Sequence, residues 1–198
     1  MRRAWVGLLL LAGCGYHFEG DPSSESLTTI SVPYIKGDSE GVLNGEIAKA
    51  LTTSGVFDYA HSAGAWVLEA AIISDGDDRI GFRYDRNPTT GTLRDNIVGT
   101  ENRRTLGIEF KLIDPHSEEI VFGPEVITVT ADYDYVDGNS IRDLVFIEEG
   151  KPRTVLDFSV GQLDNVVGAH DDVNYPIYQM AAQKITQRLL LHRLKTQN

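Results

Sequence analysis

The chain has 198 residues, with 18 Lys or Arg against 29 Asp or Glu, so its formal net charge is −11. This acidic balance excludes broad nucleic-acid binding, because such proteins need Lys and Arg to displace counterions from phosphates. The single cysteine excludes a fold held by internal disulfides, so a hydrophobic core must stabilise it.

The amino terminus has the pattern of an export signal that ends at a lipid-attachment cysteine. Arg2 and Arg3 precede an apolar stretch over 5–11, which is far shorter than the roughly 18 to 20 residues that span a bilayer. Leu-Ala-Gly-Cys at 11–14 resembles a bacterial lipobox, in which the cysteine is acylated and becomes the first residue of the mature chain. We expect residues 1–13 to be removed and Cys14 to carry palmitate or similar acyl chains. An ordinary secretory signal with an unmodified cysteine is the alternative.

Signal removal defines the mature chain. Taking 13 residues from 198 leaves 185, a length at which one domain buries roughly 70% of its unfolded surface. Loss of the two arginines leaves 16 basic against 29 acidic residues, so the net charge becomes −13. The Gly, Ser, Pro and acidic residues of 14–26 predict a flexible tether, and 27–198 a single domain.

A strand, a helix and a second strand are predicted at the start of this domain. Apolar and polar residues alternate over 28–33, and apolar residues recur at helical spacing over 39–54. The apolar segment 65–73 predicts the next strand, and this succession favours a parallel pair joined by a right-handed crossover.

The ends of the first helix carry capping signals. Asp38 or Ser39 can cap its amino terminus, and Gly55 fits a left-handed cap at its carboxyl end. Its apolar face predicts core packing, with a docking surface as the alternative; the face consists of Val42, Leu43, Ile47, Ala50 and Leu51.

An antiparallel hairpin is predicted next. Residues 102–114 alternate clearly, 114–117 have turn chemistry, and 120–131 return as a further strand. The core face of the first of these strands is expected to carry Leu106, Ile108, Phe110 and Leu112.

The chain ends in a predicted amphipathic helix, which Asn174 can cap ahead of Pro176. Its stripe predicts a cover for the sheet, with a membrane-surface helix as the alternative; the stripe consists of Ile177, Met180, Ala181, Ile185, Leu189, Leu190 and Leu194. The element order predicts an α+β two-layer sandwich, with a mixed four-stranded sheet and two helices on one face.

Residues 136–174 form an insert before this helix. Within it, 144–147 and 154–158 flank a turn-like stretch at 148–152, which predicts an additional hairpin. This hairpin either contacts a partner or extends the same sheet.

Six arginines form the candidate binding patch, and the turn-rich stretch 87–91 among them predicts a long hairpin that protrudes from the sheet. Arginine suits phosphate groups. Interleaved acidic residues favour the alternative of mutual pairing. The patch consists of Arg79, Arg83, Arg86, Arg94, Arg103 and Arg104, and the acidic residues are Asp75, Asp77, Asp78, Asp85, Asp95 and Glu101.

Three acidic groups were candidates for a metal or catalytic site: 75–78, 132–139 and 170–172. None has a recognised ligand spacing, and the second lacks the register and final glutamate of a calcium loop. The five histidines show no metal-ligand spacing, and no nucleophile-elbow or phosphate-cradling motif is present. The sequence therefore predicts no metal, no cofactor and no catalytic residue.

Several segments resemble the LPS-assembly lipoproteins of the LptE family. Gly-Cys-Gly-Tyr-His-Phe at 13–18 resembles the family's lipidated start, and Val-Pro-Tyr at 32–34 its Val-Pro-aromatic element. The helix at 39–54 and the following Gly-Val-Phe also resemble the family, and the resemblance covers about two-thirds of the chain. The long insert and the acidic charge depart from it.

This resemblance implies a lipoprotein of the outer membrane, facing the periplasm, that plugs and stabilises a large β-barrel translocon for lipopolysaccharide. Gly15, rather than an aspartate, follows the cysteine, which agrees with an outer-membrane destination. The implied protein is no enzyme, and the six arginines are candidate lipopolysaccharide contacts. A membrane-tethered carrier of lipid or small ligands is the alternative; an apolar cavity of several hundred cubic ångströms would favour it, and a solid core the scaffold.

Overall fold

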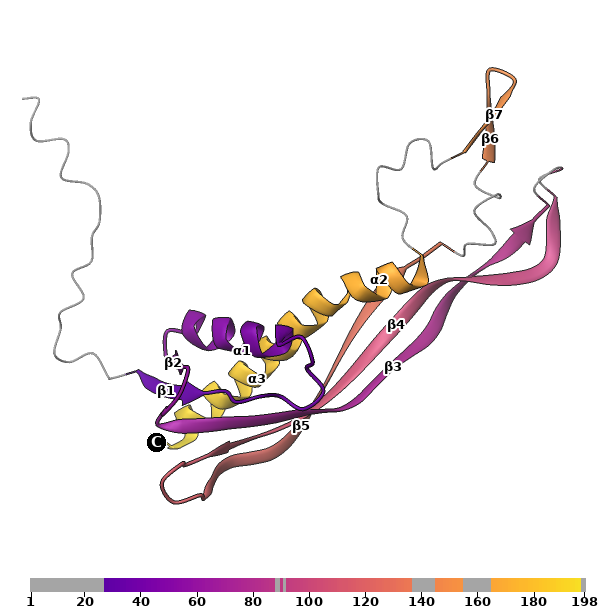
Figure 1. Ribbon diagram of the computed structural model, residues 1–198. Coiled ribbons are helices and arrows are strands. Elements are labelled where there is room, and N and C mark those ends of the chain that lie inside the picture. Colours follow the sequence, from indigo (N-terminus) through magenta and orange to yellow (C-terminus); the bar gives the residue numbers. More distant parts are fainter. Residues whose placement is uncertain (1–26, 88–89, 91, 137–144, 155–164, 197–198) are drawn as a thin grey trace, which may run out of the picture.

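The computed structural model describes residues 27–87, 90, 92–136, 145–154 and 165–196. Within these ranges the chain forms a five-stranded sheet, a separate two-stranded sheet and three helices (Figure 1). In chain order the elements are β1 (Thr28–Ser31), α1 (Val42–Thr53), β2 (Phe57–Ala60), β3 (Trp66–Arg86), β4 (Leu93–Ile113), β5 (Ile120–Asp134), β6 (Val145–Glu148), β7 (Lys151–Thr154), α2 (Val166–Asp172) and α3 (Asn174–Thr196).

The larger sheet has the strand order β2-β1-β3-β4-β5. β1 runs parallel to both β2 and β3, whereas β3, β4 and β5 are antiparallel neighbours. The α+β class, the mixed sheet and the parallel pair are therefore confirmed. The prediction of four strands was wrong, because β2 has only four residues and its length is too short to show a period.

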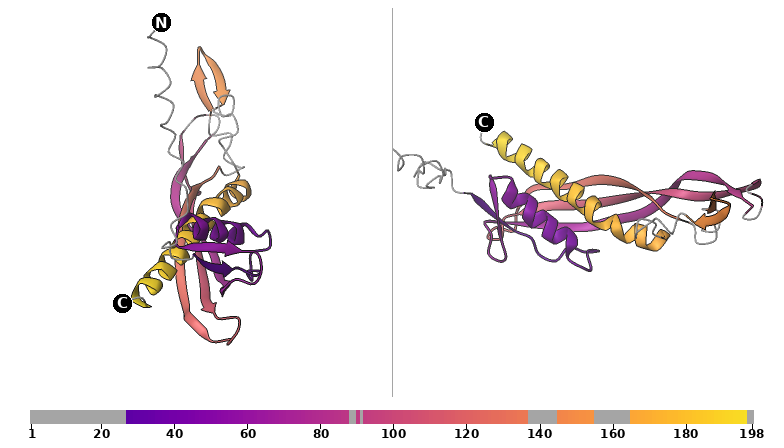
Figure 2. Two further views of the ribbon diagram at one scale, coloured as in Figure 1. Left: turned by 90° about the vertical axis from the view of Figure 1, so that its left-hand side faces the viewer. Right: turned by 90° about the horizontal axis from the view of Figure 1, so that it is seen from above.

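The core lies between this sheet and the helices, which gather on one side of it (Figure 2). The alternation in β4 creates this face, since Leu106, Ile108, Phe110 and Leu112 are at most 1% exposed while Glu109 between them faces solvent. Helix α1 contributes Leu43, Ile47 and Leu51, and α3 contributes Ile177, Ala181, Ile185 and Leu189.

Local contacts and backbone geometry define both ends of α1. The N-cap of α1 is Gly41 and not the predicted Asp38 or Ser39, but Asp38 accepts a hydrogen bond from the backbone N–H of Asn44 at 2.9 Å and so satisfies a free donor of the first turn. The Asn44 amide donates to the carbonyls of Val32 and Pro33, which ties the helix to the chain leaving β1. Gly55 has φ +68°, as a left-handed cap requires.

The start of helix α3 differs from the prediction. Asn165, not Asn174, is a capping residue: it accepts hydrogen bonds from two backbone N–H groups at the beginning of α2, a helix that was not predicted. The two helices almost join, because the N–H of Ile177 donates to the carbonyl of Val173. Met180 and Leu194 were expected in the core, but they are 36% and 59% exposed. The buried residues of α3 recur every four positions from Ile177 to Leu189, and these two residues are not part of that series.

The predicted extra hairpin exists as β6 and β7, but it forms its own two-stranded sheet and does not extend the larger one. Glu149 and Gly150 have φ of +51° and +75°, as the two central residues of a tight hairpin turn require. The returning strand therefore starts at 151, earlier than the predicted 154, and it includes Pro152.

Candidate functional site

The most distinctive feature is a ribbon formed by the far ends of β3 and β4. Each strand has 21 residues, which spans about 70 Å when extended. The third strand, β5, ends at Asp134 opposite Glu101, so the hairpin continues alone beyond that point. We call residues 79–86 and 93–100 the distal ribbon; it projects past the helices (Figure 1), and this protrusion confirms the predicted hairpin.

A buried cation lies at the base of the ribbon. Arg104 is 3% exposed, and its Nε and Nη2 donate to the two carboxylate oxygens of Asp75 at 2.8 and 2.7 Å. Its Nη1 donates to the side-chain oxygen of Asn174, and the guanidinium lies 6.0 Å from the ring centre of Tyr178. The hydrogen bonds from Arg104 lower the pKa of Asp75, and those to Asp75 raise the pKa of Arg104.

A second set of polar contacts continues toward α2. The Tyr133 hydroxyl donates to Asp77 at 3.1 Å and accepts from the Asn102 amide at 3.0 Å. His170 of α2 lies 3.5 Å from the same Asp77 carboxylate, and burial raises the pKa of Tyr133. These contacts close the polar end of the core. We call all these residues together the Arg104 cluster: Arg104, Asp75, Asn174, Tyr178, Tyr133, Asp77, Asn102 and His170.

A break in the strand alternation creates this cluster. The register between β3 and β4 shifts between Ile72 and Ser74. After the shift, Asp75 and Asp77 pair with Leu106 and Arg104 and lie on the helix side of the sheet. Two of the acidic groups noted in the sequence, 75–78 and 170–172, thus meet around an arginine and a tyrosine.

The six arginines do not gather on one surface. Arg104 is buried, whereas Arg103 lies on the opposite face and makes a two-pronged pair with Asp132 at 2.7 and 2.8 Å. Those hydrogen bonds lower the pKa of Asp132. Arg94 pairs with Asp85 at 3.4 Å, and both Arg83 and Arg86 also have partners.

The Arg79 side chain lies against Gly99 of the neighbouring strand. A Cβ at Gly99 would lie 2.6 Å from Cδ of Arg79 and would also meet the Tyr135 hydroxyl, so the glycine makes room for both side chains. Arg79 itself is exposed. It is therefore the patch arginine that a ligand could reach with the least rearrangement.

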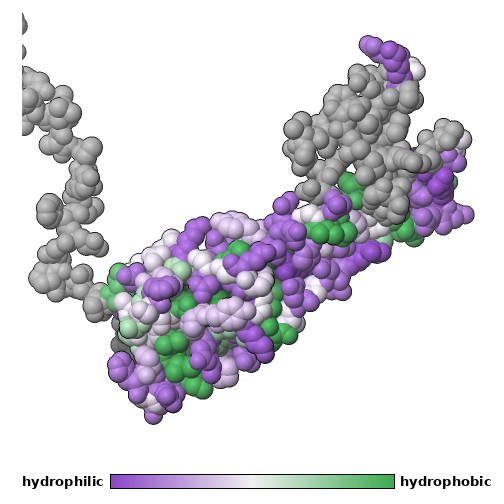
Figure 3. Space-filling model, viewed as in Figure 1, coloured by the Kyte–Doolittle hydropathy of each residue, from purple (hydrophilic) through white to green (hydrophobic). Residues whose placement is uncertain are grey.

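The ribbon also exposes several large apolar side chains. Register pairs Tyr84 with Ile97 and Phe82 with Gly99, which places three large apolar groups on the face that carries Arg79. Figure 3 shows apolar residues interspersed among polar ones on the projecting end. The exposed fractions are 37% for Ile80, 57% for Phe82, 59% for Tyr84, 61% for Leu93 and 58% for Ile97.

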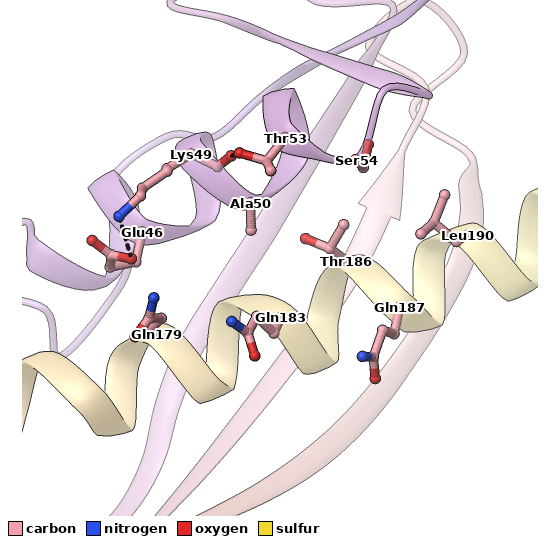
Figure 4. Close-up of a pocket in the computed structure, with 10 residues that line it drawn as sticks. All are labelled: Glu46, Lys49, Ala50, Thr53, Ser54, Gln179, Gln183, Thr186, Gln187 and Leu190. Atoms are coloured by element: carbon pink, nitrogen blue, oxygen red, sulfur yellow. Dashed lines mark hydrogen bonds and ion pairs between the residues drawn. The ribbon is translucent and has the colours of Figure 1, made fainter.

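A groove of about 280 Å³ lies between α1 and α3, on the far side of the helices from the sheet (Figure 4). Most of its lining residues have polar side chains, but they present mainly apolar atoms to the groove. The lining residues are Glu46, Lys49, Ala50, Thr53, Ser54, Gln179, Gln183, Thr186, Gln187 and Leu190. The space between helices and sheet is instead filled by the core side chains, most of them at most 1% exposed.

Neither a metal site nor a membrane-spanning helix is found in the described parts of the chain. No three Asp, Glu, His or Cys side chains there lie close enough together to hold a metal ion. Similarly, none of the helices in those parts is long and apolar enough to cross a bilayer. Cys14, the predicted lipidation site, and Asp137 of the second acidic group lie outside the described residues.

Comparison with known proteins gives neighbours in structure only. No family model and no curated protein matches the chain. A minor lipoprotein from Acinetobacter baumannii aligns with 84% of this chain and 94% of its own, at 13% identity and TM-score 0.47. Rare lipoprotein B from Shewanella oneidensis aligns with 86% of this chain and 99% of its own, at 16% identity and TM-score 0.43. A lipoprotein B from Nitrosomonas europaea aligns with 88% of this chain and 90% of its own, at 11% identity and TM-score 0.46.

Proposed function

We propose that this protein is a lipid-anchored outer-membrane protein, attached through Cys14 and facing the periplasm, that plugs and helps assemble a large β-barrel translocon for lipopolysaccharide. The distal ribbon carries the proposal: it projects from the body and exposes Phe82, Tyr84 and Ile97 on one face. Clustered exposed apolar side chains indicate an interaction surface. A ribbon of this length can reach into the lumen of a large barrel.

The filled core supports a scaffold more than a carrier. A carrier would need an apolar cavity between sheet and helices, but Leu68, Ile108 and Ile177 meet there with no exposed surface. The groove between α1 and α3 lies elsewhere, outside the space between helices and sheet. We therefore propose a role in assembly, with no catalysis.

Purification of the tagged, lipidated protein from outer membranes tests the proposal. We expect a large β-barrel protein in near-stoichiometric amount. Cys14→Ser should reduce its recovery, because the unanchored protein is no longer concentrated at the membrane. If wild-type protein brings down no barrel, the assembly role is wrong.

A pair of variants tests the contact surface. Phe82→Ser combined with Tyr84→Ser should lower barrel recovery about tenfold, the effect of losing aromatic anchors at an interface. Tyr34→Ser is the matched control, because Tyr34 is 73% exposed and lies outside the ribbon. Equal recovery with both variants would place the contact elsewhere.

Direct contact with lipopolysaccharide is a separate part of the proposal. Arg79→Glu and Arg103→Glu should each weaken capture of lipopolysaccharide, because each replaces a reachable cation with an anion. Arg104→Glu is unsuitable, since it would place a second carboxylate beside Asp75 in the core. Unchanged capture by both exposed variants would favour the mutual-pairing alternative.

A further inference from the structure

The last turns of α3 expose two leucines on the side away from the core. Leu191 and Leu194 are 52% and 59% exposed, whereas the nearby Leu189 is 1% exposed. Each residue advances about 100° around a helix, so the two leucines lie roughly 140 to 160° from Leu189. They are three residues apart and are therefore neighbours on the helix surface. Figure 2 shows this end of α3 projecting from the body.

The charged side chains of this part of the chain are all basic. The 26 residues after Asp172 contain four Lys or Arg and no Asp or Glu, although the whole chain has 29 acidic residues. Arg188 precedes Leu191 by three residues and Lys195 follows it by four, so both lie beside it on the helix surface. Arg188 contacts Glu125 at 3.3 Å, whereas Lys195 is exposed. The turn 114–119, which has three acidic residues, lies apart from this surface in the left view of Figure 2.

This end of α3 lies beside the start of the folded domain. Arg193 donates to the carbonyl of Val56 at 2.7 Å, and its guanidinium lies 5.9 Å from the ring centre of Phe57. Phe57 pairs in register with Thr28, the first residue of β1. The described chain begins one residue earlier, at Leu27. The distal ribbon is at the opposite end of the molecule (Figure 1).

The length of the predicted tether gives this position a consequence. Residues 14–26 number 13, and a flexible chain of that length has a root-mean-square span of about 20 Å. β3 alone extends about 70 Å toward the distal ribbon. An anchor at Cys14 would therefore bring the end of α3, and not the distal ribbon, to the surface of the membrane.

We propose that the end of α3 rests on the anionic phospholipid headgroups of the leaflet that holds the anchor, with Leu191 and Leu194 entering the headgroup region and Lys195 contacting phosphate. Exposed leucines flanked by cations are typical of helices that lie on anionic membranes. The contact keeps this end of the domain at the membrane surface and leaves the distal ribbon free for a partner. The inference rests on the proposed anchor at Cys14, but not on the barrel or on lipopolysaccharide.

The test supplies the anchor chemically. The thiol of Cys14 in the purified mature chain is coupled to a maleimide phospholipid in nanodiscs of phosphatidylglycerol and phosphatidylethanolamine. Failure of acylation in the native host, which mass spectrometry detects, is thus separate from failure of the inference. A phospholipid with a spin-labelled headgroup broadens the NMR signals of nearby methyl groups. The methyl signals of Leu191 and Leu194 should broaden at least about threefold more than those of Leu93, which is 61% exposed on the distal ribbon.

Variants separate a contact from mere proximity. Leu191→Ser combined with Leu194→Ser should reduce the broadening of the Lys195 backbone amide at least about twofold, because the apolar side chains no longer enter the headgroup region. Lys195→Glu should reduce the broadening of both leucines by a similar factor, because it reverses the charge that faces the lipid phosphates. Leu93→Ser is the matched control and should leave the end of α3 as in the wild type.

The composition of the nanodisc tests the charge of the occupant. Replacing phosphatidylglycerol with phosphatidylcholine should reduce the broadening of Leu191 and Leu194, because the anionic headgroups are gone. The proposal is overturned if this replacement has no effect, if exposed methyl groups broaden uniformly over the molecule, or if the double serine variant behaves as the wild type does. Shifts of the two leucines that depend on protein concentration without lipid would assign this surface to a second copy of the chain and would also overturn it.

Discussion

Arg104 and Asp75 make a two-pronged ion pair whose two members differ greatly in exposure. The Arg104 side chain is 3% exposed, whereas that of Asp75 is 39% exposed. The carboxylate therefore keeps part of its hydration, and the guanidinium depends on its protein partners. Removing Asp75 and removing Arg104 should therefore lower the stability of the fold by different amounts.

The first prediction follows from this inequality. Asp75→Ala leaves a buried cation without its main partner and should lower the free energy of unfolding by about 3 kcal/mol. Arg104→Met should cost only about 1 kcal/mol, because the half-exposed Asp75 can rehydrate and the methionine fills much of the space. Urea unfolding of both variants measures the difference. Equal losses, or a larger loss for Arg104→Met, would contradict this account.

The same pair predicts a dependence on pH. The pKa of Asp75 lies below its ordinary value of 3.8, chiefly because it accepts hydrogen bonds from Arg104. A carboxyl group with a lowered folded-state pKa stabilises the fold above 3.8, and this stabilisation is lost as the pH falls from that value through the lowered one. Asp75→Asn should therefore lose less stability than the wild type between about pH 4 and pH 2.

Asp132→Asn is the control for the pH experiment. Asp132 also has a lowered pKa through Arg103, but that pair is exposed on both sides, at 48% and 39%. Exposed pairs contribute little to stability, so the acid-unfolding curve should change less than in Asp75→Asn. The chemical denaturation midpoint at several pH values compares the three proteins. Parallel curves of denaturation midpoint against pH for the wild type and Asp75→Asn would contradict the prediction.

The sequence carried a signal for the burial of Arg104. Counting back from Leu106 in steps of two places Arg104 and Asn102 on the core face of the strand. The same alternation places the neighbouring Arg103 on the opposite, exposed face. The inward position of Asp75 could not be predicted in the same way, because a register shift reverses the alternation in β3.

Other differences also have local causes. Asn174 precedes a proline, a pattern typical of a cap, but α2 leads almost directly into α3 and the Asn174 side chain accepts from Arg104. The apolar face of the distal ribbon depends on two further register shifts, between Arg79 and Phe82. The main helices and the core-facing parts of β3 and β4 could be predicted, but β3 continues to Arg86 and β4 begins at Leu93, beyond the predicted ends at 73 and 102. Bulges depend on strand pairing, which a single sequence does not show.

Two glycines should respond in opposite ways to the same substitution. A Cβ at Gly64 would lie 2.5 Å from the backbone N of Ser31 and 2.9 Å from the carbonyl O of Trp66. Gly64→Ala should therefore force β1 and β3 apart and cost at least about 2 kcal/mol. Gly45 is the fourth residue of α1 and is exposed with open space around it, so Gly45→Ala should stabilise the protein by about 0.5 to 1 kcal/mol. Thermal unfolding measures both, and destabilisation by Gly45→Ala would contradict the assigned helix.

Asp38 and Ser39 were equivalent candidates for the cap of α1, and the structure separates them. Asp38 is 3% exposed and accepts from the Asn44 N–H, whereas Ser39 is exposed. Asp38→Ala should cost about 1 to 2 kcal/mol, because a helix N–H loses its acceptor. Ser39→Ala should change stability by less than about 0.5 kcal/mol. Asp38→Asn keeps an acceptor oxygen and should restore much of the loss in urea unfolding. If it is as damaging as alanine, the carboxylate stabilises the helix through its charge and not through this hydrogen bond.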